Sequence, residues 1–546
     1  MKRLHQDRLD RREFLAAVGR SAGGTAMLRS MLAMGIATTA GCGSSSAGQG
    51  GGAAPPPPAP PPPPSSVQSP RPGDWPANVG NGRSVVVLGA GIAGMTAALE
   101  LGRLGYTCTI LEASDRAGGR NRTLRGGDLA AETDSTQTCS FDVDPDLYFN
   151  PGPARIPHHH EFLLGYCREF GVALEPFVNS NRAALLHSSS AFSGQPQVTR
   201  QITTDLRGGI ADLLASAIDQ GALDQQLSAA DRVNLLAMLR NFGALDGSND
   251  YRGSSRAGFP GQETRGSRQR GELLPPRDLV DLISTTFFQS RSDFAESLDQ
   301  QSTMLQPTGG MDRIADAFAA RVSASIEFEA VVSEIRKTAS GARVVYADRF
   351  GTTREATADH CVCTIPATVL RNIPNDFSAS HSTAIAAFNY TPATKIAFQS
   401  RRFWEQDNNI YGGISWTDQD ITQIWYPSAG FGRQNGIVVG SYIFGGPAGS
   451  NFTAQTPQQR ITSTVSQANA LHPAFGSEVA RGISVAWPKV PYQLGAWGVS
   501  APGILLTPDD AIYFAGEHLS ILQGWQEGAI LSAYHAIDGI VTADSP

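Results

Sequence analysis

Cysteine is scarce in this chain, with six residues among 546. Cys108, Cys361 and Cys363 fall in strand-like runs, where a thiol behaves as a small core residue. No spacing in the sequence matches a typical zinc site. Residues 158–160 are three consecutive histidines, but we expect their side chains to point in different directions. The sequence therefore predicts neither a disulfide framework nor a bound metal.

Long hydrophobic runs and basic clusters are absent as well. The apolar stretch at 33–40 is far shorter than the roughly 20 residues of a membrane-spanning helix. The formal net charge is −7, and the first 41 residues carry more Lys and Arg than Asp and Glu. Removing them leaves a more acidic protein, which argues against non-specific binding of nucleic acid. The arginine-containing stretch at 265–270 is interpreted as a solvated polar loop.

The amino terminus carries a targeting signal. Residues 10–15 (DRREFL) have the form of a twin-arginine export signal, and a weakly apolar stretch continues to Cys42. Residues 39–42 resemble a lipoprotein processing site, with Thr39 where leucine is usual. Lipidation of Cys42 and simple cleavage nearby are therefore two alternatives. We predict an exported protein, periplasmic or extracellular, with a membrane-tethered lipoprotein as one form of it.

A low-complexity segment follows the signal. Its first part is rich in Gly and Ser, and residues 55–64 are nearly all proline. Gly/Ser-rich chain is flexible, whereas a proline run forms an extended spacer of about 3.1 Å per residue. Neither composition can build a core. We interpret residues 43–80 as a tether; a polyproline ligand for a partner domain is the alternative.

The next segment begins a nucleotide-binding unit. Residues 85–88 form a short apolar run of mostly β-branched residues, as a buried parallel strand requires. Gly89, Gly91 and Gly94 follow with G-x-G-x-x-G spacing. These glycines make the tight turn, let the backbone approach a pyrophosphate and let the helix pack close to the strand. The helix has an apolar face and is expected to end at Gly105.

A second strand at 108–111 delivers Glu112 about 20 residues beyond the glycines, where a carboxylate can accept from ribose hydroxyls. Glu112, Arg116, Gly119 and Arg120 then fit the pattern E-x-x-x-R-x-G-G-R. This signature resembles that of the flavin amine oxidase superfamily. Two arginines and a Gly-Gly turn bring positive charge and open backbone toward phosphates, which suits FAD. The resemblance implies FAD as the cofactor.

A second block resembles one branch of this superfamily. Residues 152–157 (GPARIP) are similar to the G-P-M-R-[LI]-P segment of L-amino acid oxidases, and a helical apolar pattern follows as far as Gly171. The resemblance implies that Arg155 binds the substrate α-carboxylate. A guanidinium can hold a carboxylate with two charge-assisted hydrogen bonds and stays protonated. A structural ion pair, or a contact to an FAD phosphate, is the alternative role for Arg155.

A third block lies at 390–427. The strand-like run at 390–398 resembles the family segment whose lysine holds a water beside flavin N5, which implies that role for Lys395. An outward-pointing surface lysine is the alternative. The run at 423–427 resembles the segment whose second aromatic residue donates a hydroxyl to the substrate carboxylate. Tyr426 matches that position, and Trp425 is the alternative register.

The carboxyl end completes the resemblance. A strand at 512–515 leads to Gly516 and Glu517, which match an A-G-E element that contacts FAD in the family. Gly524 and Trp525 precede a helix and are implied to receive the substrate amine and to form a pocket wall. His518 is interpreted as a packing residue. The cofactor contacts implied by the resemblance are Gly89, Gly91, Ala93, Gly94, Glu112, Arg116, Gly119, Arg120, Gly152, Pro153, Ala154, Arg155, Val332, Gly516, Glu517, Trp525 and Ala529.

The resemblance implies an α/β fold. It consists of a discontinuous FAD-binding Rossmann-type domain, a mixed-sheet substrate domain and a helical lobe. The expected boundaries are a signal peptide at 1–42, a tether at 43–80, an FAD domain at 81–125, 300–372 and 505–546, a substrate domain at 126–190 and 373–504, and a helical lobe at 191–299. Helical stretches are expected at 210–218 and 231–239 within that lobe.

The predicted function is oxidative deamination of L-amino acids to 2-oxo acids, with release of ammonia and hydrogen peroxide. The sequence has no histidine from 188 to 359, so a helical-lobe histidine base has no counterpart. Positioning of the Cα–H bond toward the flavin is then expected to supply most of the catalysis. An amino acid 2-monooxygenase, a primary-amine oxidase and a non-enzymatic flavoprotein remain alternatives. The preferred amino acid and the oligomeric state stay open, a homodimer being one alternative.

Overall fold

The computed structural model describes residues 73–260 and 271–545. The predicted export signal, Cys42 and the tether as far as residue 72 lie outside these residues. The described residues divide into two compact units, one with residues 200–260 and 271–285 and the other with residues 73–199 and 286–545. Among the described residues, no helix combines the length and the apolar character needed to cross a membrane.

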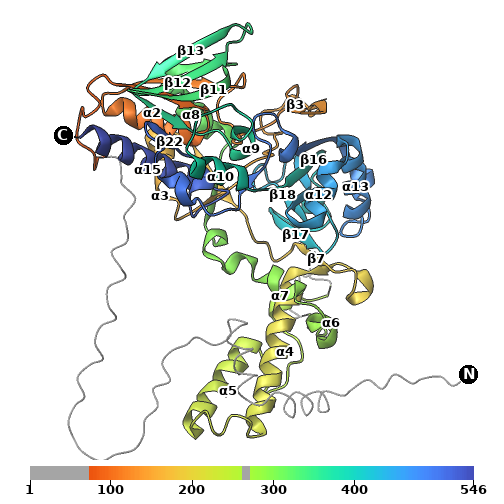
Figure 1. Ribbon diagram of the computed structural model, residues 1–546. Helices are drawn as coiled ribbons and strands as arrows, with labels where there is room; N and C mark the ends of the chain where they lie inside the picture. Colours follow the sequence, from red (N-terminus) through yellow and green to blue (C-terminus); the bar gives the residue numbers. More distant parts are fainter. Residues whose placement is uncertain (1–72, 261–270, 546) are drawn as a thin grey trace, which may run out of the picture. The chain divides into compact units, whose positions relative to one another are not determined.

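A parallel sheet lies at the centre of the larger unit (Figure 1). The valines of the predicted first strand pair on both sides with parallel neighbours, as their near-continuous apolar character requires. The strands, in spatial order, are β10 (Ile326–Phe328), β2 (Thr107–Glu112), β1 (Ser84–Leu88), β14 (His360–Cys363) and β22 (Ile512–Phe514).

The alternation of side chains along β1 divides the core into two layers. Val85 and Val87 pack with helices α2 (Ile92–Arg103) and α15 (Gln526–Asp544). Val86 and Leu88 face the other side, toward an antiparallel sheet of β11 (Val331–Thr338), β12 (Gly341–Ala347) and β13 (Thr353–Ala358). Helix α2 ends as expected, since Leu104 caps it and Gly105 adopts a φ of 87°. The predicted Rossmann-type domain is confirmed.

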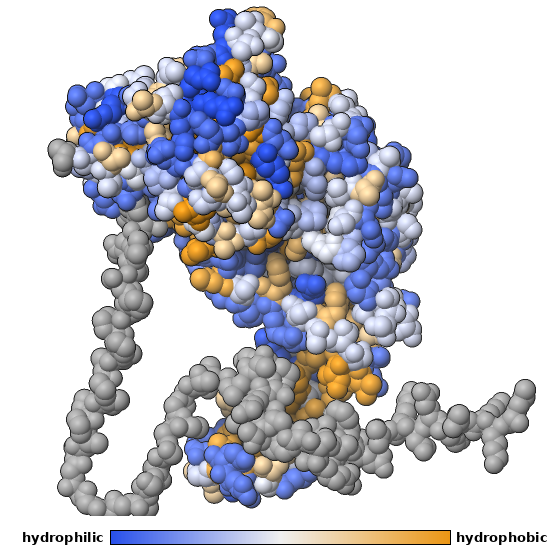
Figure 2. Space-filling model, viewed as in Figure 1, coloured by the Kyte–Doolittle hydropathy of each residue, from blue (hydrophilic) through white to orange (hydrophobic). Residues whose placement is uncertain are grey.

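The antiparallel sheet presents a polar outer face. Arg343 on β12 forms ion pairs with Glu334 on β11 and with Glu355 on β13. Figure 2 shows largely hydrophilic residues over the part of the surface where these strands lie. Exposed pairs of this kind contribute little to stability, so the sheet is held mainly by its apolar inner face.

The larger unit also contains a mixed seven-stranded sheet. All of its strand pairs are antiparallel except β17–β7. Helix α13 (Pro457–Ala468) lies against one face, where Phe398 and Val438 are buried. The order is β20 (Val479–Ala486), β16 (Ala393–Arg401), β19 (Asn435–Phe444), β18 (Gln423–Tyr426), β17 (Gly413–Thr417), β7 (Leu185–His187) and β8 (Gln197–Val198).

The connecting segments are shorter elements. The predicted helix ending near Gly171 is α3 (Glu161–Phe170), and Gly171 takes a left-handed conformation with φ 72°. A three-stranded sheet joins β5 (Ile156–Pro157), β9 (Met304–Pro307) and β6 (Leu174–Phe177). The remaining helices and strands of this unit are β3 (Leu129–Glu132), β4 (Ser135–Thr138), α7 (Phe287–Ser292), α8 (Asp312–Val322), α9 (Ala367–Leu370), α10 (Ala379–Ala387), β15 (Tyr390–Thr391), α11 (Phe403–Gln406), α12 (Gly446–Ala454), α14 (Phe475–Glu478) and β21 (Trp497–Gly498).

The smaller unit is helical. The two helical stretches expected there are parts of α4 (Thr199–Asp219) and α5 (Ala229–Gly243), and α6 (Leu279–Ile283) follows. Apolar side chains from α4 and α5 form its core. Ser228 and Asp231 make a capping box that fixes the start of α5, because each satisfies a backbone amide of the first turn.

The described end of the predicted tether is packed. Trp75 is 7% exposed and belongs to the core that contains α2 and α15. Its indole N–H donates to Asp538 on α15 at 3.2 Å. A buried tryptophan contributes a large apolar contact area, so this single residue anchors the segment to the core. The folded part of the chain therefore begins before residue 80, within the range assigned to the tether.

A buried ion pair fastens β3 to α13. Arg460 places its two terminal nitrogens 2.6 and 2.7 Å from the carboxylate oxygens of Glu132. Glu132 also accepts from the amide of Ala486 at 2.9 Å, and both charged side chains are fully buried. Because both charges are removed from water, the loss of either one would leave the other buried without a partner.

We expect Arg460→Ala to lower the free energy of unfolding by about 3–5 kcal/mol, because it leaves the Glu132 carboxylate buried without its cation. Urea-induced unfolding followed by tryptophan fluorescence measures the change. Lys489→Ala is the matched control, since it removes an exposed pair with Asp134 just beyond the same strand. Equal effects of the two substitutions would contradict this role of Arg460.

Candidate functional site

The carboxyl end of β1 opens into the main cavity of the larger unit. The cavity has a volume of about 560 Å³, within the range of small-molecule and cofactor sites. Thirteen of the seventeen cofactor contacts expected from the sequence line it: Gly89, Gly91, Ala93, Glu112, Gly119, Arg120, Gly152, Pro153, Val332, Gly516, Glu517, Trp525 and Ala529. The other four, Gly94, Arg116, Ala154 and Arg155, lie outside its lining.

The glycine turn fits a dinucleotide. Gly89 has φ 107°, and a side chain on Gly94 would place its Cβ 2.0 Å from the carbonyl oxygen of Gly89. Gly91, in contrast, has open space where a Cβ would stand. The turn therefore lets helix α2 pack closely against β1 and leaves its backbone open to the cavity. The residues present fit the pyrophosphate of a bound dinucleotide.

Glu112 and the arginines behind the turn organise its surroundings. Glu112 accepts from the amides of Ala90 and Ser114 at 2.6 and 2.8 Å, which fixes its carboxylate at the end of β2. Arg116 donates to the carbonyl of Gly119 at 2.7 Å and so supports the Gly-Gly turn from behind. Burial lowers the pKa of Arg116 to about 10.

Arg120 and Glu517 form an ion pair inside the cavity wall. The two groups approach to 2.5 Å, and Arg120 also donates to the carbonyl of Ala496 at 2.6 Å. The other oxygen of Glu517 accepts from the amide of Gly524 at 2.8 Å. This pair ties the first nucleotide-binding segment to the carboxyl-terminal one. The sequence analysis named both residues as cofactor contacts but not their pairing.

Lys395 points inward from β16. It is 3% exposed, and its Nζ donates to the carbonyl oxygens of Asn150 and Gly152 at 3.2 and 2.6 Å. Its Nζ also lies 4.6 Å from the ring centre of Tyr442, its partner in the β16–β19 register. Burial, aided by the nearby Arg155 charge, lowers the pKa of Lys395 to about 7. The alternative of a surface lysine is excluded.

Arg155 lies in an aromatic box. Its guanidinium carbon is 4.6 Å from the ring centre of Trp425, 5.7 Å from that of Phe294 and 6.0 Å from that of Phe177. The terminal nitrogen Nη1 is buried and has no hydrogen-bond partner among the described residues. Burial lowers the pKa of Arg155 to about 10, so the group still carries its charge at neutral pH.

No acidic side chain in the described part of the chain pairs with Arg155, which removes the support for a structural ion pair. A second cavity of about 80 Å³ is lined by its neighbours Ala154, Phe177 and Trp425. Lys395 lines both this cavity and the large one. Arg155 and Lys395 are thus two neighbouring buried cations, neither paired with an acidic side chain among the described residues, and the arrangement suits an anionic ligand.

Tyr426 lines the smaller cavity, but its hydroxyl has partners of its own. Its hydroxyl is in a buried network with Ser415 at 2.7 Å and with Nε2 of His472 at 2.6 Å. Burial raises its pKa well above the usual value of 10. Successive residues of a strand face opposite sides, so Trp425 rather than Tyr426 faces Arg155. This orientation favours the alternative register, and the role of Tyr426 stays a prediction.

Gly524 and Trp525 line the large cavity at the start of α15, as expected. Gly524 has φ 83°, a left-handed conformation that favours glycine. His518 packs against Phe388 and Tyr390, and burial lowers its pKa to about 4. Tyr442 also lines the cavity but was missed, because it lies in no continuous motif of the chain.

Gly94→Ala is expected to abolish retention of the dinucleotide cofactor, because its Cβ would collide with the Gly89 carbonyl in the turn. The measurement is flavin absorbance per chain after gel filtration. Gly102→Ala in the same helix has open space around the new Cβ and serves as the control with unchanged cofactor content. Full retention of flavin in Gly94→Ala would disprove the predicted packing.

Lys395→Met is expected to raise the melting temperature most at pH below about 7. Because the folded-state pKa of Lys395 lies below its ordinary value of 10.5, the unfolded chain binds more protons between these two values. The cost of burying this charge is thus fully present below pH 7 and is relieved as the pH rises toward 10.5. Thermal scans of both proteins at pH 6 and pH 9 test this, and a pH-independent difference would contradict it.

Known proteins resemble this chain over most of its length. A putative L-amino-acid oxidase of Bacillus subtilis (strain 168), YobN, is 28% identical over 481 residues, which cover 82% of this chain and 93% of the relative. The flavin-dependent L-tryptophan oxidase RebO of Lentzea aerocolonigenes is 28% identical over 500 residues, covering 85% and 98%. An L-amino-acid oxidase of Echis ocellatus is 26% identical over 479 residues, covering 84% and 88%.

Solved structures share the fold. Cyclohexylamine oxidase from Brevibacterium oxydans IH-35A superimposes with a TM-score of 0.54 at 17% identity, covering 85% of this chain and 99% of its own. Wild-type putrescine oxidase bound to putrescine gives a TM-score of 0.53 at 15% identity, covering 84% and 99%. At these identities the likeness concerns the fold alone, and it agrees with the α/β architecture predicted from the sequence.

A family model agrees with both comparisons. The model described as flavin containing amine oxidoreductase matches residues 92–540, which is most of the chain. The match begins directly after Gly91 and spans Glu112, Lys395 and the start of α15, all of which line the large cavity. The predicted FAD cofactor is confirmed, and the chain belongs to the flavin-containing amine oxidoreductases.

Proposed function

We propose that this protein is an FAD-dependent L-amino acid oxidase. The observation that carries the proposal is the buried guanidinium of Arg155, which has aromatic neighbours and no acidic partner among the described residues. The overall reaction converts an L-amino acid, oxygen and water into a 2-oxo acid, ammonia and hydrogen peroxide. The flavin, when bound, supplies the redox chemistry by accepting the α-hydrogen with its electron pair.

Arg155 would hold the α-carboxylate. Its planar fork matches a carboxylate with two hydrogen bonds, and the buried Nη1 gives one donor without a competing partner. Trp425 and Phe177 exclude water from this contact, which strengthens it. Tyr442 is the hydroxyl we assign to the carboxylate in place of Tyr426, because it lines the cavity and lies within electrostatic reach of Arg155.

Lys395 would accept or donate a proton at Nζ. An ammonium group has three donors, and two positions on Nζ are directed to the Asn150 and Gly152 carbonyls. The third position then carries either a hydrogen or a lone pair, and a pKa of about 7 makes both forms available near neutral pH. We assign this position to the water that the resemblance places beside the flavin.

Gly524 and Trp525 would complete the pocket. The amide of Gly524 is held by Glu517, so the loop before α15 is fixed relative to the cavity wall. This rigidity supports a role in directing the substrate Cα–H bond, where small misplacements are costly. The printed names of the relatives, L-amino-acid and L-tryptophan oxidases, support the same substrate class.

Primary-amine oxidation is the competing function, since the structural neighbours are named as amine oxidases. Arg155 distinguishes amino acid oxidation from amine oxidation, because an amine without a carboxylate gives this cation nothing to bind.

Export by the twin-arginine route, lipidation at Cys42 and a dimeric state stay proposals from the sequence.

The test is anaerobic bleaching of the flavin by single L-amino acids, followed by product analysis in air. We expect bleaching, and then a 2-oxo acid, ammonia and hydrogen peroxide. In Arg155→Met, KM for the amino acid should rise by roughly 30-fold or more, the equivalent of about 2 kcal/mol.

Arg155→Lys is the matched variant, because it keeps the positive charge but loses the planar guanidinium. Its KM should lie between those of the parent protein and of Arg155→Met. Turnover of an amine without a carboxylate should respond little to either change. Bleaching by amines alone, or an unchanged KM in Arg155→Met, would disprove the proposal. An amide and carbon dioxide as products would identify a monooxygenase instead.

A further inference from the structure

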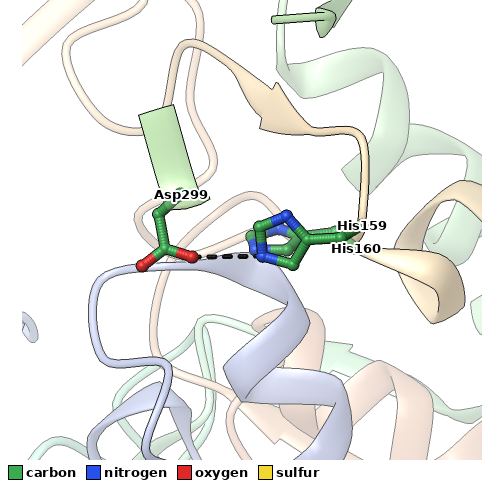
Figure 3. A group of neighbouring side chains, drawn as sticks. All are labelled: His159, His160 and Asp299. Carbon is green, nitrogen blue, oxygen red and sulfur yellow. Dashed lines mark hydrogen bonds and ion pairs between the residues drawn. The ribbon is translucent and has the colours of Figure 1, made fainter. Parts of the chain in front are cut away.

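Two of the three consecutive histidines converge on an acidic residue. His159 Nε2 lies 3.1 Å from Oδ1 of Asp299, and the rings of His159 and His160 are 4.8 Å apart at nearly right angles. One ligand-type atom of each residue lies within 4.8 Å of the other two (Figure 3). The sequence-based expectation that these side chains point apart is therefore wrong for this pair.

The backbone explains the convergence. The amide of His160 donates to the carbonyl of Pro157 at 3.1 Å, so residues 157–160 form a turn and not a strand. His160 then caps helix α3 with φ −77° and ψ 73°. Side chains that would alternate along an extended chain are brought to the same side by this turn. Asp299 arrives from a distant segment, a single 3-10 turn at Leu298–Gln300.

His160 is the unusual member of the cluster. Its side chain is fully buried, and neither ring nitrogen has a hydrogen-bond partner among the described residues. A neutral imidazole has one donor and one acceptor, and burying both unpaired is costly. The acceptor nitrogen of such a ring carries a lone pair. A metal ion is a partner that would satisfy this lone pair.

We propose that His159, His160 and Asp299 bind a divalent transition-metal ion of the zinc type. Two imidazoles and one carboxylate are a ligand set that zinc accepts, with a fourth position left to water. Ligand atoms about 2.1 Å from a tetrahedral ion lie roughly 3.4 Å apart, so the widest separation in the cluster, up to 4.8 Å, must contract by about 1.4 Å. Asp299 can supply this movement, since its side chain is 42% exposed.

The proposed metal site is open to solvent on one side and contacts Trp525 on the other. His159 is 25% exposed, so the ion can arrive from solvent on the side of Asp299. On the other side, the His160 ring lies 5.2 Å from the ring of Trp525, which lines the large cavity. A bound ion would thus join the turn before α3 to residues 298–300 directly behind a wall of the proposed substrate pocket. The cluster takes no part in the proposed oxidation, so the two proposals are independent.

Equilibrium dialysis of the flavin-loaded, chelator-treated protein against zinc chloride tests the site. We expect one retained zinc ion per chain in the parent protein. Asp299→Asn and His159→Gln should each weaken binding by at least about 10- to 100-fold, the loss that follows even from changes outside the ligand shell. His158→Gln is the matched control, because His158 is the exposed neighbour outside the cluster and should leave zinc binding unchanged.

Flavin absorbance per chain reports folding in all four proteins, and Asp299→Asn decides the outcome if His159→Gln fails to fold. Zinc should also raise the melting temperature of the parent and His158→Gln proteins but not of the other two. Absence of retained zinc in the parent protein would overturn the proposal. Equal retention in Asp299→Asn would overturn it as well.

Discussion

Two positive charges buried side by side without a carboxylate are the constraint on which this site depends. Arg155 and Lys395 each lose hydration, and the charge of one makes that of the other less favourable. The protein offsets part of this cost with aromatic faces and with two backbone carbonyls. These neighbours stabilise the cations without neutralising them. The site therefore keeps a net positive field, which suits the anionic substrate group that we propose for it.

A series of contacts connects residues along the wall of the flavin cavity. Lys395 holds the carbonyl of Gly152, and Gly152 presses so closely on Arg120 that a Cβ would lie 2.1 Å from the Arg120 carbonyl oxygen. Arg120 pairs with Glu517, which in turn holds the amide of Gly524. All five residues line the cavity. Segments far apart in the chain are thereby fixed relative to one another, and the positions of the lysine and of the α15 loop are not independent.

The sequence could predict the parts of the site that lie within continuous motifs. The strand, glycine turn and Glu112 are local features, and the resemblance pointed to Lys395, which lines both cavities, and to Arg155, whose neighbours line the smaller one. Tyr442 could not be found this way, because it meets Lys395 only through the β16–β19 register. The start of the folded region was also missed, since one buried indole, Trp75, decides it. Pairing between distant segments is a tertiary property that no local pattern encodes.

Trp425 and Tyr426 are neighbours on β18, and they offer different groups to the site. Trp425 faces Arg155, but its indole N–H already donates to Gln423 at 2.7 Å. It therefore offers the substrate a ring face and no free donor. The hydroxyl of Tyr426 has its partners Ser415 and His472 on the opposite side, where a buried hydroxyl needs them. If Arg155 holds the substrate carboxylate as we propose, neither residue of the 425–426 pair offers it a free donor, and the guanidinium and the Tyr442 hydroxyl are left for that contact.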